Sequence, residues 1–148
     1  MLKAELCFSY LTIESKAVPP VELRSKMADW FFGCDLCQTV CPWNEKVFRK
    51  KGLPQQPALS TDSFLSLSES EKNELIHFFQ FILSSSNKKM TKHFQGSALL
   101  RAGGNGLKRN ALIVIGNRKL SVLKPEVEKQ IENSKFTELA TWCLAQFN

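Results

Sequence analysis

The stretch Cys34-Asp35-Leu36-Cys37-Gln38-Thr39-Val40-Cys41-Pro42 holds three of the five cysteines in this 148-residue chain. Two residues separate the first pair of cysteines, three separate the second pair, and proline follows the last one. Thiols grouped at this spacing in a chain without a secretory context are typical of metal binding or redox chemistry rather than of disulfides. We therefore expect the chain to be organised around a sulfur-ligated metal centre.

The spacing matches the second half of the C-x2-C-x2-C-x3-C-P run that binds 4Fe–4S clusters in bacterial ferredoxins. Phe31 stands where the first cysteine of that run would be, so three thiolates remain. In two-cluster ferredoxins the cysteine before the proline ligates the other cluster. The pattern thus indicates more than one cluster, and the five cysteines of the chain are too few to complete two.

Cys143 lies on an apolar helical stripe and is expected to be a core residue. Four candidate metal ligands remain: Cys7, Cys34, Cys37 and Cys41. They could close one cluster, or they could be half of a two-cluster site completed by another polypeptide segment. A structural zinc site is the competing interpretation, although the chain has one C-x2-C knuckle where such sites often have two.

Three motifs resemble those of the epoxyqueuosine reductases. Residues 7–14 read C-F-S-Y-L-T-I-E, and residues 33–44 read G-C-D-L-C-Q-T-V-C-P-W-N, where Leu36 replaces an aspartate of the family pattern. A looser third motif comprises Gly96-Ser97, Arg101-Ala102-Gly103, Arg109-Asn110-Ala111 and Gly116-Asn117. The order and spacing match over residues 7–117, although residues 103–106 replace a more basic stretch of the family.

The resemblance implies an oxidoreductase that reduces epoxyqueuosine in tRNA to queuosine, using cobalamin and two 4Fe–4S clusters. It covers only the C-terminal part of that family, so a cobalamin-binding N-terminal segment or subunit would supply the first complete cysteine run. Carried over to this chain, Cys7, Cys34 and Cys37 ligate one cluster and Cys41 ligates the other. No catalytic residue is assigned here, and the fragment alone is expected to be inactive and cytoplasmic.

The charge distribution suggests a polyanionic partner. The chain carries a net charge of +6, and no acidic residue occurs between Leu75 and Pro125. A stretch of one sign is the electrostatic footprint of a nucleic-acid-binding surface, although a solvated basic face is the alternative. We expect Arg101 and the first turn of the following helix to form a phosphate site on an exposed surface that binds tRNA. The candidate residues are Lys88, Lys89, Lys92, Arg101, Lys108, Arg109 and Asn110.

The periodicity predicts an all-α fold, with a HEAT-like helical domain over residues 61–148 that follows a ferredoxin-like cysteine segment over 1–48 and a linker over 49–60. The resemblance and the charge distribution imply that the helical domain docks tRNA. One helix is predicted from Pro20 through Phe31, and Ser68-Glu69-Ser70-Glu71 reads as a capping box. Asn105 is predicted to cap another helix, Pro125 to start one, and residues 135–147 to form the last. No apolar run approaches the roughly 18 residues of a membrane span.

Two other function classes fit the sequence. One is a stand-alone helical nucleic-acid-binding module with a structural metal, and the other is a ferredoxin-like electron-carrier subunit. A complete C-x2-C-x2-C-x3-C-P run encoded immediately upstream would favour the reductase over both.

Overall fold

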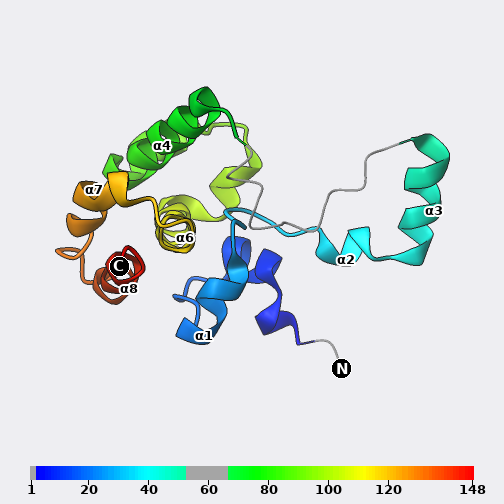
Figure 1. Cartoon of the computed structure of the whole chain (residues 1–148), viewed down its shortest axis with the longest axis horizontal. Coiled ribbons are helices and arrows are strands. Elements are labelled where there is room, and N and C mark those ends of the chain that lie inside the picture. The colour runs from blue at the N-terminus through cyan, green and yellow to red at the C-terminus, as the bar shows by residue number, and fades with distance from the viewer. Residues whose placement is uncertain (1–2, 53–66) are drawn as a thin grey trace.

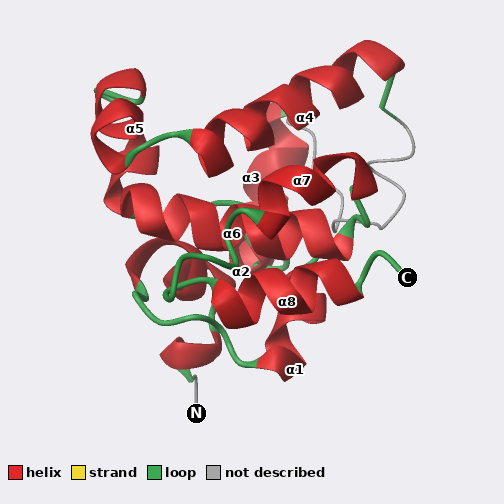
Figure 2. Ribbon diagram, turned by 90° about the vertical axis from the view of Figure 1, so that its left-hand side faces the viewer, coloured by secondary structure: helices red, strands yellow, loops and turns green. Residues whose placement is uncertain are grey.

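The computed structural model describes residues 3–52 and 67–148, and every regular element in these two ranges is helical (Figure 2). The prediction of an all-α fold is therefore confirmed. Short helical turns occupy the N-terminal part: η1 (Ala4–Leu6), η2 (Tyr10–Glu14), α1 (Val21–Arg24) and η3 (Ser25–Met27). None of the described helices is long and apolar enough to cross a bilayer.

Two helices form an arm that extends away from the rest of the molecule (Figure 1). They are α2 (Leu36–Thr39), which contains Cys37, and α3 (Pro42–Lys51), whose N-cap is Cys41. Pro42 occupies the first position of α3, where its missing N–H is not needed, and Gly52 ends the helix in the left-handed conformation with φ of 60°. The arm exposes large apolar side chains, among them Trp43, which is 77% exposed.

The second half of the chain forms the helical body. Its elements are α4 (Glu69–Ser84), α5 (Asn87–His93), η5 (Ala98–Arg101), α6 (Gly103–Asn117), η6 (Ser121–Leu123), α7 (Lys124–Glu128) and α8 (Thr137–Ala145). Helix α6 is central, because it packs against α4, α5 and α8 and buries nearly all of its residues from Gly106 to Gly116. A helix buried on nearly all sides has to be surrounded by other elements, and its polar side chains, such as Arg109 and Asn110, then need partners inside the protein.

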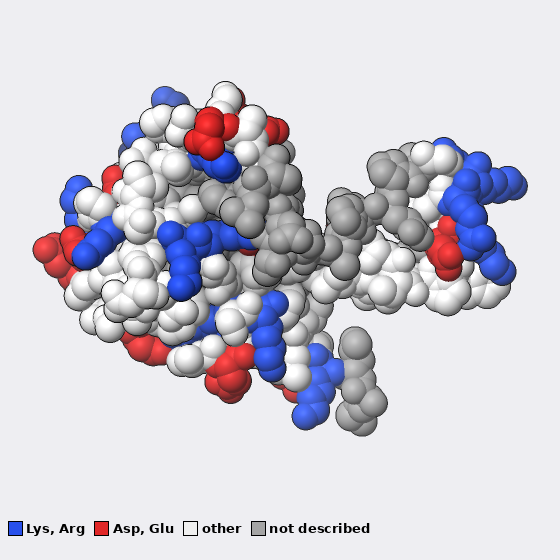
Figure 3. Space-filling model, viewed as in Figure 1, with Lys and Arg blue, Asp and Glu red and all other residues white. Residues whose placement is uncertain are grey.

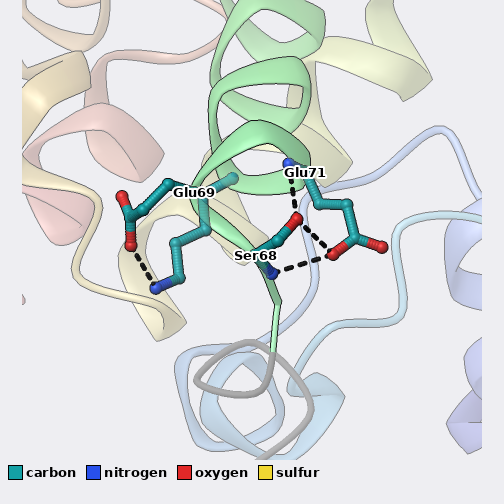
Figure 4. Close-up of polar contacts among 4 residues, drawn as sticks. Ser68, Glu69 and Glu71 are labelled. Atoms are coloured by element: carbon teal, nitrogen blue, oxygen red, sulfur yellow. Dashed lines mark hydrogen bonds and ion pairs between the residues drawn. The ribbon is translucent and has the colours of Figure 1, made fainter.

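The capping box predicted at Ser68 is confirmed (Figure 4). The Ser68 hydroxyl accepts a hydrogen bond from the Glu71 backbone N–H at 3.3 Å, and the Glu71 carboxylate accepts one from the Ser68 N–H at 2.8 Å. The Ser68 hydroxyl also donates to the Glu71 carboxylate at 2.7 Å, and this hydrogen bond, followed by the one from the Ser68 N–H, lowers the pKa of Glu71. The reciprocal pair satisfies two donors that the first turn of α4 leaves free.

Two predicted helix boundaries are wrong. The helix expected to run from Pro20 to Phe31 ends at Met27, and Ala28 follows with φ of 43°. The carbonyls of Arg24 and Ala28 accept hydrogen bonds from the Asn117 side chain, so tertiary contacts hold the chain in this turn. Asn105 does not cap α6, because η5 leads almost directly into a helix that already begins at Gly103.

The proposed linker is helical at its start, since α3 includes residues 49–51. Residues 53–60 of the linker lie outside the described residues. The HEAT-like character of the body and the domain boundaries at 48 and 61 remain predictions. Pro125 lies in the first turn of α7, and the last helix, α8, falls within the predicted range of residues 135–147.

Candidate metal centre and nucleic-acid surface

Three of the four predicted metal ligands border one pocket. Cys7, Cys34 and Cys37 line an open hollow of about 540 Å³, and Cys41 is not among its lining residues. The other lining residues are Lys3, Leu6, Phe8 and Leu36. The pKa of Cys34 is raised chiefly by its partial burial, with further contributions from the neighbouring Cys7 and Cys37 thiols. The fold thus brings together thiols that lie 27 to 30 residues apart in the sequence.

A buried hydroxyl joins the segment of Cys7 to the segment of Cys34. The Thr12 Oγ1 atom accepts a hydrogen bond from the Gly33 N–H at 3.0 Å and donates one to the Phe8 carbonyl at 2.7 Å. Gly33 has φ of 76°, a conformation that favours glycine and turns the chain into the cysteine run. The pattern around Cys34 gave no indication of this contact.

Asn110 of α6 holds the same two segments from the other side. Its Nδ2 atom donates to the Thr12 carbonyl and to the Phe31 carbonyl, both at 2.8 Å. Asn110 is fully buried. A buried amide needs hydrogen-bond partners, and Asn110 has one in each cysteine-bearing segment. The side chain therefore holds the two segments at a fixed distance from each other.

The guanidinium of Arg109 fastens the N-terminal segment to the body. It donates to the backbone carbonyls of Leu11, Thr12, Ser15 and Ala17 and to the Asn110 side chain. Arg109 is only 2% exposed. The prediction that Arg109 and Asn110 lie on an exposed RNA-binding surface is therefore wrong, because both side chains satisfy buried backbone carbonyls instead.

The remaining basic candidates lie nearer the surface. Lys108 is half-buried, and burial lowers the pKa of its ammonium group. Arg101 is exposed but forms an ion pair with Glu14 at 2.6 Å. The predicted phosphate site of Arg101, Lys108 and Arg109 therefore does not form one exposed surface.

Lys88, Lys89 and Lys92 are exposed on α5, and we call them the α5 lysine cluster. The Lys89 ammonium lies 5.3 Å from the centre of the Phe81 ring, which supports this side chain at the surface. Whether the cluster binds RNA remains a prediction.

Sequence reasoning missed a second group of basic side chains on the arm. Helix α3 carries Lys46, Arg49, Lys50 and Lys51, and Figure 3 shows Lys and Arg side chains gathered there. Basic residues in the last turn also interact favourably with the helix dipole, so these side chains stabilise α3 whether or not they bind a partner. Residues 49–51 were assigned to a linker, which hid this helical face.

The thiols do not converge on a single ion. Within the described ranges, no three His, Cys, Asp or Glu side chains lie close enough together to hold one metal ion. A zinc ion requires four ligands at about 2.0–2.3 Å, whereas an iron–sulfur cluster spreads its thiolate ligands over several iron atoms. Three thiols around a wide pocket, with a fourth outside it, fit the donor set of a cluster better than that of a mononuclear site.

Comparison with known proteins agrees with this geometry. Residues 1–44 match a family model described as a 4Fe-4S double cluster binding domain. This range contains all four predicted ligands.

Among curated proteins, an epoxyqueuosine reductase of Francisella cf. novicida is 36% identical over 119 residues, and that of Escherichia coli is 31% identical over 145 residues. This chain is related to the epoxyqueuosine reductases. The two alignments cover 79% and 97% of this chain but 29% and 35% of the relatives, so the chain spans about a third of their length.

Solved structures show the same fold. The epoxyqueuosine reductase of Bacillus subtilis superimposes with a TM-score of 0.71 at 25% identity, covering all of this chain and 37% of that one. An epoxyqueuosine reductase crystallised with an epoxyqueuosine-modified tRNA stem loop superimposes with a TM-score of 0.70 at 24% identity, covering 99% and 36% of the two chains.

Proposed function

We propose that this chain is the iron–sulfur and tRNA-docking part of an epoxyqueuosine reductase, which reduces epoxyqueuosine in tRNA to queuosine. The observation that carries the proposal is the arrangement of the cysteines. Three thiols border one pocket, and Cys41, beside the proline, lies outside it, all within the segment that matches a double-cluster domain. The related proteins of Francisella cf. novicida and Escherichia coli, which are about three times as long, are both named epoxyqueuosine reductase.

In this proposal Cys7, Cys34 and Cys37 ligate one 4Fe–4S cluster, and Cys41 ligates a second. Cys143 is not available as a ligand because it is fully buried in the core. The remaining thiolates come from a cobalamin-binding segment or subunit outside these 148 residues. The clusters supply one-electron transfer when bound, and the cobalamin supplies the reductive chemistry on the substrate.

The residues of this chain then act as ligands and as a scaffold. Thr12 and Asn110 hold the two cysteine-bearing segments together. The arm presents Cys41 and the exposed Trp43 to the segment that completes the second cluster. The α5 lysine cluster contacts the phosphates of the tRNA that carries the epoxyqueuosine. The reaction takes place in the cytoplasm.

The test is anaerobic reconstitution of the 148-residue chain with iron and sulfide. We expect substoichiometric or unstable iron in the unaltered chain, with the absorption of a 4Fe–4S cluster, and loss of that absorption in Cys34→Ala and Cys37→Ala. Cys143→Ala is the matched control and should retain it. Stable binding of one zinc ion with no uptake of iron would refute the cluster assignment.

The activity of the fragment is a separate measurement. With added cobalamin and a reductant, the chain alone should not convert epoxyqueuosine, because half of the thiolates and the cobalamin-binding segment are absent. Turnover by the purified chain would contradict the division of roles proposed above.

A further inference from the structure

A second hollow lies on the body, where residues from three parts of the chain meet. It has a volume of about 460 Å³. Its lining residues are Lys16, Val18, Asn105, Gly106, Arg109, Lys135 and Phe136. Three of these are cationic and none is acidic, so we call it the cationic pocket.

The charge of Arg109 has no carboxylate partner among the described residues. Its N–H groups bind backbone carbonyls and the neutral Asn110 amide, and burial lowers the pKa of its guanidinium to about 10. Carbonyl dipoles satisfy the donors but do not neutralise the net charge. A buried cation without a counter-ion raises the electrostatic potential of the adjoining hollow, since the surrounding protein screens it less than water does.

Lys16 and Lys135 add two ammonium groups at the edge of the same hollow. Both are exposed, so their flexible stems allow the charges to reach a bound anion. Asn105 and Gly106 lie in the first turn of α6, where the helix dipole is positive. The two ammonium groups supply the donors that phosphate oxygens require, while Arg109, whose N–H groups are all used within the protein, and the positive helix end add charge to the same concave site.

We propose that the cationic pocket binds a phosphate group. The group could belong to the backbone of tRNA, in which case the inference rests on the proposed function, or to a free phosphate ester or inorganic phosphate. The pocket shares Arg109 with the predicted phosphate site but includes neither Arg101 nor Lys108, and its two lysines were not among the residues predicted from the sequence.

The direct test titrates inorganic phosphate into the full chain at constant ionic strength and records amide chemical shifts or heat. We expect saturable binding, with shifts at Asn105 and Gly106, and a loss of affinity of at least about tenfold in Lys16→Gln/Lys135→Gln. The matched control is Lys26→Gln/Lys124→Gln, which removes two exposed lysines elsewhere on the surface. Absence of saturable binding, or equal weakening in both double variants, would overturn the proposal.

A second arm identifies the source of the phosphate. If tRNA supplies it, inorganic phosphate competes with tRNA, and the pocket variant weakens tRNA binding more than the control variant does. If phosphate binding depends on both lysines but tRNA affinity is the same in the two variants, the ligand is a free phosphate. Neither experiment requires iron. The phosphate-binding proposal can therefore be refuted while the cluster assignment stands, and the cluster assignment can be refuted while phosphate binding stands.

Discussion

Single residues hold the proposed metal-binding segments in place. The sequence predicts the roles of some of these residues but not of others. The run from Cys34 to Cys41 could be recognised because its spacing is a local property of the chain, whereas its role as a set of cluster ligands remains a prediction. Asn110 was assigned to the RNA surface, yet it is buried and bound to Thr12 and Phe31. An asparagine beside an arginine fits either role in sequence, and only the packing of distant segments onto α6 distinguishes them.

The role of Asn110 predicts a specific defect. Asn110→Ala removes the side-chain donor of the Phe31 carbonyl and leaves the Thr12 carbonyl with only the longer Arg109 contact at 3.4 Å, so we expect a loss of about 1–3 kcal/mol in the free energy of unfolding. We also expect less iron per chain after reconstitution, because the segments of Cys7 and Cys34 are no longer held together. Urea unfolding and iron analysis measure the two effects.

Asn117→Ala is the control for this prediction. Asn117 donates to the carbonyls of Arg24 and Ala28, which lie away from the cysteines in sequence, so its loss should reduce stability without reducing iron. Equal iron content in the two variants would show that Asn110 has no positioning role.

Cys143 gives the chain an alkaline sensitivity. Burial raises the pKa of its thiol to about 12, whereas a thiol in the unfolded chain has a pKa near 8.5. Above pH 8.5 the unfolded state therefore loses this proton first, and the free energy of unfolding falls as pH rises toward 12. The slope has an upper limit of about 1.4 kcal/mol per pH unit.

The comparison of two alanine variants tests this contribution. Between pH 8.5 and 11, Cys143→Ala should lose less stability than the unaltered chain does, as measured by urea unfolding. Cys7→Ala removes an exposed thiol and serves as the control. If the two variants depend on pH identically, the buried thiol contributes nothing to alkaline unfolding.

The start of a helix could be predicted from the sequence where a local signal marks it. The capping box at Ser68 and the proline of α7 were found because each satisfies or removes a backbone donor within one turn. The boundary at Met27 was wrong because a distant residue, Asn117, holds the turn, and the boundary at Gly103 was wrong because η5 continues almost directly into α6. Tertiary contacts override propensity at such positions.

The contact of α6 with α8 predicts the effect of a substitution at Gly116. A Cβ atom there would lie 2.7 Å from the Trp142 ring and 3.4 Å from the Cys143 backbone. Alanine favours a helix by about 1 kcal/mol over glycine, but overpacking costs about 1–3 kcal/mol. We expect Gly116→Ala to lower the melting temperature.

A double-mutant cycle with Trp142→Leu isolates the steric term. The smaller side chain makes room, so Gly116→Ala should cost less in that background, or even stabilise. A cost that is the same in both backgrounds would place the defect in the backbone of α6 rather than in its contact with Trp142.

At the scale of the whole molecule, the proposed metal-binding site and the proposed RNA-binding surface lie in different parts of the chain. The four predicted metal ligands lie in the N-terminal segment and the arm, whereas the α5 lysine cluster belongs to the body. The acid-free stretch predicts a basic surface, but sequence alone could not separate its exposed side chains from its buried ones, because Lys108 and Arg109 are neighbours on α6 and only Arg109 is fully buried. Charge-reversal of Arg109 would disrupt the core, so it cannot test RNA binding.

The α5 lysine cluster gives the sharper test. Each phosphate contact releases counterions and contributes about 0.7–0.9 to the slope of log affinity against log salt concentration. If all three lysines contact phosphates, Lys88→Gln/Lys89→Gln/Lys92→Gln should lower the slope by about 2–3 and weaken binding to different tRNAs alike, since phosphate contacts carry no sequence information. Filter binding at several salt concentrations measures the slope. Lys26→Gln/Lys124→Gln/Lys129→Gln removes the same charge from exposed positions elsewhere, so a similar loss of slope there would mean that net charge, not the α5 surface, attracts the RNA.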